Sequence, residues 1–198
     1  MQEKVYEDNW PLFEKVLGYL RYLTVRKYIT DEGKPVCADI GCGFNGRFLF
    51  SIATKIKQGY GIDIRANEIT KGNITLINNS HVGGGIPLES NSIDRVFSLA
   101  VLEHLDEKDL ALLISESVRI LRPAGKLILT TPTPMAKPVL EFLSFKLGLI
   151  SPESILEHKH YWNKPELFEL MERYGCEVVK YKKFQFGMNQ LLVAKKIS

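Results

Sequence analysis

The feature that most constrains this sequence is a glycine-rich turn directly after a short apolar strand. Residues 36–40 read VCADI, and the following GCGFNG carries glycines at 41, 43 and 46 before a segment with a helical pattern. This order of strand, glycine turn and helix is typical of α/β folds that bind an adenosine ligand at the helix start. Asp63 ends the next predicted strand, where its two oxygens could accept hydrogen bonds from both ribose hydroxyls.

The rest of the chain alternates between apolar strands and amphipathic helices. Strands are predicted at 36–40, 59–64, 74–77, 93–100 and 126–131, followed by a terminal pair at 176–184 and 189–196. Helices are predicted at 10–30 and 46–57, from Asp106 to Pro123, and from Asn163 to Gly175. This alternation predicts an α/β fold, a doubly wound sheet with helices on both faces.

The composition is that of a folded domain. The 198 residues are 45% hydrophobic, and a net charge of +3 is too weak to favour nucleic acid as a partner. We expect a single domain over residues 1–198, with residues 1–32 as an N-terminal helical cover and residues 134–163 as a substrate lid. No uncharged apolar stretch reaches about 18 residues, so no membrane span is expected.

The cysteines and the N-terminal residues bear on location and on metal binding. Three cysteines without a CxxC pattern, and an N-terminus without the apolar region of a secretory signal, favour a reduced, cytoplasmic setting. Cys37 and Cys42 have no neighbours in the sequence that would complete a ligand set, so no metal is expected.

Asp39 distinguishes between two classes of ligand that could bind at this glycine loop. A dinucleotide would place its pyrophosphate close to the Asp39 carboxylate, and the two negative charges would repel. S-adenosylmethionine carries a sulfonium and an ammonium instead, and a carboxylate beside the loop favours both. Asp39 therefore favours S-adenosyl-L-methionine over a nicotinamide dinucleotide.

The sequence resembles the small type 11 family of class I S-adenosylmethionine-dependent methyltransferases. The resemblance covers about residues 35–196 and rests on four ordered segments: ADIGCGFNG, GIDI, IPLESNSIDRVFSLAVLEHL and ILRPAGKLILTTPTP. It implies a Rossmann-like, seven-stranded sheet with its last strand antiparallel. It also implies that Asp39, Gly41 and Gly43 hold the methionine part of the cofactor and that Asp63 holds the ribose.

Two departures from the family pattern affect the expected cofactor contacts. Asn45 stands where the third glycine is usual, and the glycine comes one residue later, at Gly46. The segment after the third strand lacks the usual acid, so Asn79, His81 or Val82 would meet the adenine. The full set of expected contacts is Asp39, Gly41, Cys42, Gly43, Gly46, Asp63, Ile64, Asn79, His81, Val82, Leu99 and Ala100.

Three histidines are the candidates for catalysis. His104 follows the fourth strand in SLAVLEHL, beside the expected cofactor, and imidazole titrates in the range that a general base needs. His158 and His160 lie in HKHYW, between two helical segments that could fold over the site. A purely structural role, tethering a helix or packing a loop, is open for all three.

The segment 134–150 is unusually apolar, and three interpretations stay open for it. It could be core or lid, line a pocket for an apolar or lipid-linked acceptor, or rest on a membrane surface or a partner.

The leading functional prediction is methyl transfer by in-line displacement to a small-molecule or lipid- or sugar-linked acceptor, most favoured at oxygen. The alternatives are an NAD-type oxidoreductase, which the literal glycine pattern favours, and a non-catalytic module that only binds the cofactor. Neither the acceptor nor the oligomeric state follows from these motifs.

Overall fold

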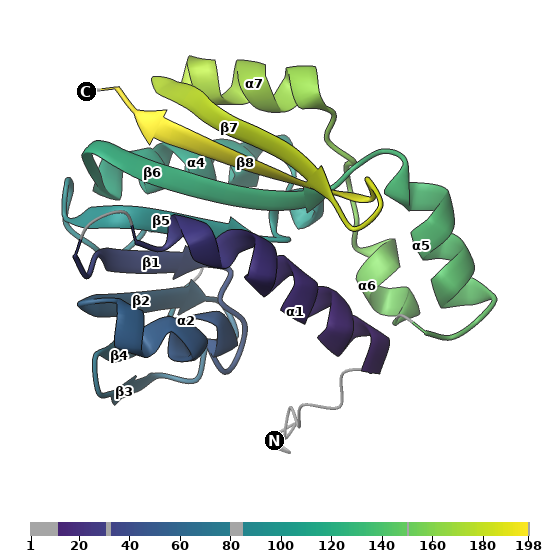
Figure 1. Ribbon diagram of the computed structural model, residues 1–198, viewed down its shortest axis with the longest axis horizontal. Coiled ribbons are helices and arrows are strands. Elements are labelled where there is room, and N and C mark those ends of the chain that lie inside the picture. The colour runs from purple at the N-terminus through teal and green to yellow at the C-terminus, as the bar shows by residue number, and fades with distance from the viewer. Residues whose placement is uncertain (1–11, 31–32, 80–84, 150, 198) are drawn as a thin grey trace.

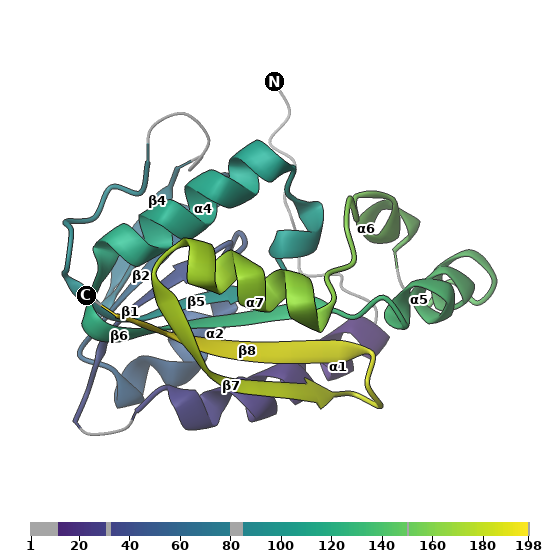
Figure 2. The same ribbon diagram turned by 90° about the horizontal axis from the view of Figure 1, so that it is seen from above.

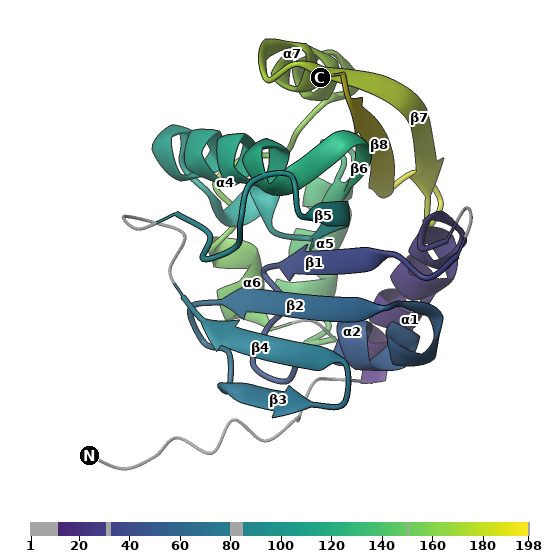
Figure 3. The ribbon, with the colours of Figure 1, turned by 90° about the vertical axis from the view of Figure 1, so that its left-hand side faces the viewer.

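The computed structural model describes residues 12–30, 33–79, 85–149 and 151–197. The described strands form one eight-stranded sheet in the order β3-β4-β2-β1-β5-β6-β8-β7 (Figures 1 and 3). Their bounds are β1 Val36–Ile40, β2 Gln58–Asp63, β3 Ile69–Lys71, β4 Ile74–Asn78, β5 Ile93–Leu99, β6 Leu121–Pro132, β7 Cys176–Phe184 and β8 Asn189–Lys196.

The strand directions confirm the predicted doubly wound fold. Strands β4, β2, β1, β5 and β6 pair in parallel, and β8 runs antiparallel to both of its neighbours, β6 and β7. The sheet has one strand more than the seven expected, because β3 pairs antiparallel with β4 at the edge. All three residues of β3 are exposed, so no apolar alternation marks this strand in the sequence.

Helices cover both faces of the sheet. Figure 2 shows α4 and α7 on one face and α1 and α2 on the other. Their bounds are α1 Leu12–Val25, α2 Arg47–Ile52, α4 Glu107–Ile120, α5 Ala136–Phe145, α6 Pro152–Leu156 and α7 Lys164–Arg173. Short 3-10 turns stand at η1 Arg26–Tyr28, η2 Ala53–Lys55 and η3 Leu102–His104.

Alternation along the strands divides the core into two layers. On β6, Leu127 and Leu129 point into the layer that includes Leu113 of α4 and Met171 of α7. Ile128, between them, points into the opposite layer with Leu49 of α2. Because successive strand residues face opposite sides, a fully apolar strand such as β6 is buried on both faces.

The predicted starts of α4 and α7 are confirmed, because a capping side chain sets each of them. The Asp106 carboxylate accepts a hydrogen bond from the Asp109 N–H at the start of α4, and Asn163 with Glu166 forms the predicted capping box of α7. The predicted end of α4 at Pro123 is too late, because the helix ends at Ile120 and β6 begins at Leu121. The predicted helix 46–57 is too long. It tightens into η2 after Ile52, where the Asn73 side chain donates to two carbonyl oxygens of the turn.

The apolar segment 134–150 does not form one helix. It forms α5, which ends at Phe145, and α6 follows after a turn in which Gly148 has a φ of +61°. Both helices stand beyond the edge where β5 and β6 end (Figure 1). Several large apolar side chains of this region are exposed, including Phe142 at 54% and Leu156 at 74%. Among the described residues, no helix is long and apolar enough to cross a membrane.

Candidate active site

The glycine loop connects β1 to α2 at the carboxyl edge of the sheet, as expected. The N–H of Gly41 donates to the carbonyl oxygen of Ile62, which holds the start of the loop against β2. A side chain at Gly41 would overlap Val101, and one at Gly46 would overlap Leu76, so both glycines permit close packing within the protein. Gly43 differs, because a Cβ there would meet no atom within 4 Å. Gly43 is thus the glycine of the loop whose α-carbon faces open space.

Asp63 fastens this loop to the end of β2. One carboxylate oxygen accepts a hydrogen bond from the Gly43 N–H at 2.9 Å, and the other accepts one from the Arg65 N–H at 2.8 Å. Asp63 is 8% exposed. Each oxygen of a carboxylate has two lone pairs, so these two bonds leave room for two more donors.

Asp39 is a buried carboxylate next to the same loop. It is 3% exposed, and within the described part of the chain its Oδ1 atom has no hydrogen-bond partner. Burial, with a smaller contribution from the charge of Asp63, raises the pKa of Asp39 to about 8. A buried carboxyl without a partner is costly, and a positively charged ligand would relieve that cost.

An open hollow of about 410 Å³ lies beside the loop, beyond the ends of β2 and β4. Its lining residues are Phe44, Arg65, Ala66, Asn67, Glu68 and Asn78. The Asn67 N–H donates to the carbonyl oxygen of Phe44, so the segment after β2 is held against the glycine loop. The hollow thus continues the surface that begins at Gly43 and Asp63.

These features fit S-adenosyl-L-methionine. The unpartnered Asp39 carboxyl would lose its proton and supply negative charge when the positive end of that molecule binds beside it. Gly43 leaves space for close approach, and Asp63 has free acceptor capacity for ribose hydroxyls. The pyrophosphate of a dinucleotide would lie beside Asp39, and its negative charge would be repelled by an ionised carboxylate there.

The turn that follows β5 lies next to the glycine loop. Ala100 has a φ of +59°, unusual for a residue other than glycine, and its N–H donates to the carbonyl oxygen of Thr130. After this turn the Val101 side chain lies against Gly41, and the chain continues into η3. The backbone conformation of Ala100 therefore sets the direction in which η3, with Glu103 and His104, leaves β5.

Glu103 is buried within η3, after the end of β5. It is 2% exposed, and its Oε2 atom accepts a hydrogen bond from the Thr131 hydroxyl at 3.1 Å. Burial raises the pKa of Glu103 to about 7, although hydrogen bonds and the charge of Arg21 in α1 oppose the shift. Glu103 is not among the site residues predicted from the sequence, because its burial depends on contacts with distant elements.

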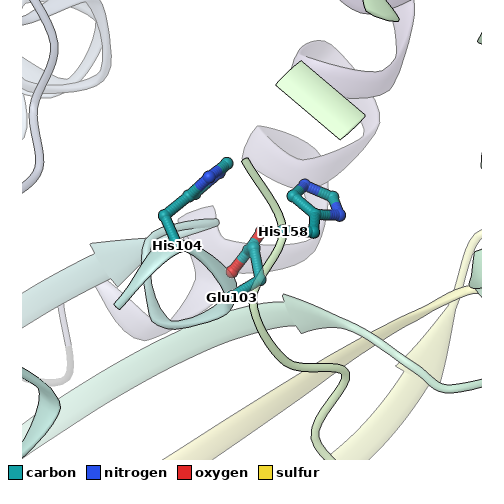
Figure 4. Close-up of side chains that lie close together, drawn as sticks. All are labelled: Glu103, His104 and His158. Atoms are coloured by element: carbon teal, nitrogen blue, oxygen red, sulfur yellow. The ribbon is translucent and has the colours of Figure 1, made fainter. Parts of the chain in front are cut away.

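His104 and His158 come together from distant parts of the chain, as Figure 4 shows. Their ring centroids are 4.8 Å apart, with the rings edge to face. Nδ1 of His158 shares a hydrogen bond with the Tyr161 hydroxyl at 3.0 Å, and Nδ1 of His104 lies 4.0 Å from the Glu157 carboxylate.

Both imidazoles are poised in the neutral form. Burial lowers the pKa of His158 to about 4, with the charge of His104 adding to the effect. Burial also lowers the pKa of His104, with the charges of Arg65 and Lys159 adding to the effect and Glu157 opposing it. At neutral pH both rings are therefore unprotonated.

The remaining predicted residues are distributed differently. Nε2 of His160 lies 3.3 Å from the Glu166 carboxylate, and its ring packs on Trp162, so His160 does not join the pair. Cys42 is half-buried against Gly61, and Ile64 is 64% exposed. The Asn79 side chain donates to the carbonyl oxygen of Gly85, while His81 and Val82 lie outside the described residues.

Comparison with known proteins agrees with this geometry. Residues 38–129 match a family model described as "Methyltransferase domain". Over 93 residues the chain is 36% identical to the "Probable S-adenosylmethionine-dependent methyltransferase" of Mycolicibacterium smegmatis. That match covers 47% of this chain and 32% of the mycobacterial protein, so it spans about a third of that relative's length.

Several solved structures share the fold. An S-adenosylmethionine-dependent methyltransferase from Mesorhizobium loti is 17% identical, with a TM-score of 0.70 over 91% of this chain and 100% of the other. One from Archaeoglobus fulgidus is 19% identical, with a TM-score of 0.68 over 93% and 94%. A methyltransferase solved with the Haloferax volcanii Trm112 activator is 16% identical, with a TM-score of 0.70 over 93% of each chain.

Residues 38–129 therefore resemble a methyltransferase domain, and the chain has the Rossmann-like fold of the solved methyltransferases. The cofactor of the proteins it resembles is S-adenosyl-L-methionine.

Proposed function

We propose that the protein transfers a methyl group from S-adenosyl-L-methionine to an oxygen atom of a small-molecule or lipid- or sugar-linked acceptor. The observation that carries this proposal is Asp39, whose buried and unpartnered Oδ1 stands beside the open glycine loop. A group of this kind fits a cationic ligand. The match of residues 38–129 to the methyltransferase model supports the same proposal.

Three residues would each contact a different part of the cofactor. Asp39 would offset the positive charge, Gly43 would let the backbone approach the ligand, and Asp63 would accept from the ribose hydroxyls. The residues Gly41, Cys42, Gly46, Ile64, Asn79, Leu99 and Ala100 would shape the surrounding surface, with His81 and Val82 next to it in the sequence. When bound, the cofactor supplies an electrophilic methyl group on a sulfonium.

On the acceptor side, His104 is the proposed base. A neutral imidazole beside the acceptor takes the hydroxyl proton as the oxygen becomes a nucleophile. His158 lies edge to face against His104 and would orient the acceptor with it. His160 contacts Glu166 at the start of α7 and has no proposed role in the reaction.

The proposed cover of the site consists of residues 1–32 and 134–163 within one domain, 1–198. The N–H groups of Lys159 and His160 donate to the carbonyl oxygen of Glu103, which ties the second segment to η3. The Gln185 side chain donates to the carbonyl oxygen of Leu17, which ties α1 to the turn between β7 and β8. The exposed apolar side chains of α5 and α6 favour an acceptor with an apolar or lipid portion.

The test is formation of S-adenosylhomocysteine from S-adenosylmethionine in the presence of pooled acceptors, followed by mass analysis for one added methyl group. We expect turnover with hydroxylated acceptors that carry an apolar portion, and lower turnover with Asp63→Ala when the cofactor is limiting. Tight cofactor binding without turnover in any pool would favour the non-catalytic module instead. Binding of NAD with hydride transfer would favour the oxidoreductase.

A further inference from the structure

We infer that Glu103, His104 and His158 form a binding site for one divalent transition-metal ion of the zinc class. Each of the three residues offers a ligand atom, and these atoms all lie within 4.8 Å of one another. They come from two segments, η3 after β5 and the chain after α6 (Figure 4). No metal is expected from the sequence, where Cys37 and Cys42 lack further ligands. His104 and His158 stand 54 positions apart, so no ligand spacing connects them.

The donor set selects the kind of ion. Two imidazole nitrogens and one carboxylate oxygen suit Zn²⁺, Co²⁺ or Fe²⁺, whereas Mg²⁺ and Ca²⁺ prefer oxygen ligands alone. Three protein ligands also leave at least one coordination position open. Sites with an open position bind a further molecule, while closed sites with four protein ligands are structural.

Neighbouring side chains already orient two of the three ligands, His158 and Glu103. The Tyr161 hydroxyl is bonded to Nδ1 of His158, and the Glu157 carboxylate faces Nδ1 of His104. His158 can then offer its second nitrogen, Nε2, to an ion. In the described part of the chain Nδ1 of His104 has no hydrogen-bond partner, so His104 can offer either ring nitrogen. The Thr131 hydroxyl donates to one oxygen of Glu103 and leaves the other oxygen as a ligand. Outer partners of this kind fix ring orientation at metal sites.

The size of the cluster is close to that of a bound site. Ligand atoms about 2.1 Å from a tetrahedral ion stand about 3.4 Å apart, so the longest edge would close by about 1.4 Å. Small rotations of the half-buried imidazoles supply such a movement. The charges of Arg21, Arg65 and Lys159 oppose a cation here, and the carboxylates of Glu103 and Glu157 offset them.

The role of the ion, unlike the site itself, rests on the proposed function. The cluster stands where the acceptor is proposed to bind, and a divalent cation there lowers the pKa of a hydroxyl that contacts it. With the ion bound, His104 is a ligand, and the charge of the ion promotes loss of the acceptor proton. In the ion-free protein, His104 is the base.

The test measures metal binding directly, without cofactor or acceptor. The full chain, prepared without a histidine tag and stripped of metal with a chelator, is titrated calorimetrically with Zn²⁺. Co²⁺ is then added, and its visible absorption is recorded. We expect one ion per chain and a Co²⁺ spectrum typical of fewer than six ligands. His158→Ala and Glu103→Gln should each weaken binding at least about tenfold.

His160→Ala is the matched control, because His160 lies two residues from His158 but contacts Glu166 instead of the cluster. It should keep the affinity of the native protein. No ion bound, or equal loss in His158→Ala and His160→Ala, would overturn the proposed site. Metal binding with no methyl transfer to any acceptor would leave the site standing and contradict the proposed function alone. Equal methyl transfer with and without chelator would contradict the role of the ion.

Discussion

The carboxylate of Asp63 accepts a hydrogen bond from the backbone N–H of Gly43, 20 residues earlier in the chain, at 2.9 Å. This bond joins the end of β2 to the turn that follows β1, so one side chain both shapes the glycine loop and stands next to it. The ribose-binding role expected for Asp63 and its structural role therefore concern the same two oxygens.

Asp63→Ala should weaken binding of S-adenosylhomocysteine at least about tenfold, because hydrogen bonds to an ionised group are worth about 1.5–3 kcal/mol each. Calorimetric titration measures the affinity. Asp94→Asn is a suitable control, because Asp94 also accepts a hydrogen bond from a backbone N–H, that of Val36 at 2.7 Å, at the other end of β1. The control should lose stability but keep affinity. Equal affinity in Asp63→Ala and the native protein would exclude Asp63 from the binding site.

Gly43→Ala tests whether the cofactor occupies the open space next to the glycine loop. Gly43 has a φ of +71°, and an added Cβ would meet no protein atom within 4 Å. We expect a loss of about 1 kcal/mol in the free energy of unfolding, from the left-handed backbone, and a larger loss of cofactor affinity.

Gly175→Ala provides the matched control for this prediction. Gly175 has a φ of +70° and equally open surroundings, but it precedes β7 at the opposite edge of the sheet. Thermal unfolding should show similar destabilisation in both variants, and calorimetry should show weaker binding only in Gly43→Ala. Unchanged affinity in Gly43→Ala would mean that the ligand does not approach the loop there.

The parts predicted well from sequence are those that neighbouring residues determine. The glycine loop, Asp39 and Asp63 follow from β1, its turn and the next strand, and the caps at Asp106 and Asn163 act within one helical turn. Edge strand β3 was missed because its residues are exposed and short-range patterns do not mark it.

The cluster of Glu103, His104 and His158 depends on tertiary contacts instead. His104 and His158 were predicted separately, but their contact depends on how the segment after α6 returns to η3. The burial of Glu103 beneath Thr131 depends in the same way on the pairing of β5 with β6. A three-residue ligand set assembled from such distant positions has no spacing that a sequence could display.

Asp39→Asn should stabilise the cofactor-free protein and weaken cofactor binding. Because burial raises the pKa of Asp39 to about 8, the folded protein keeps this proton between about pH 4 and pH 8 while the unfolded chain releases it. The contribution of Asp39 to the free energy of unfolding therefore falls as pH rises through this range. At pH 8 the variant should be more stable than the native protein by about 1–3 kcal/mol.

Urea unfolding at pH 5 and pH 8 checks the stability of the two proteins. Calorimetry at pH 7 in two buffers of different ionisation enthalpy should also show proton release when S-adenosylmethionine binds the native protein but not the variant. A stability difference between the two proteins that is the same at both pH values would show that Asp39 is ionised without ligand.

His104→Ala should lower kcat about 100-fold in chelator-treated protein and leave the affinity for S-adenosylhomocysteine nearly unchanged. Burial lowers the pKa of His104, and only the neutral imidazole accepts a proton. Activity of the native protein should therefore fall only below about pH 6.5, the ordinary pKa of histidine. Steady-state rates between pH 5 and pH 8 measure this dependence. The same acid limb in His104→Ala would show that another group is the base.

The central claim is that Asp39 beside an open glycine loop selects a cationic adenosine ligand. It is tested most directly by calorimetric titration of the purified protein with S-adenosylmethionine, S-adenosylhomocysteine and NAD. We predict micromolar binding of the first two and no detectable binding of NAD. Binding of NAD alone would contradict the assignment of the cofactor, and the proposed methyl transfer would fail with it.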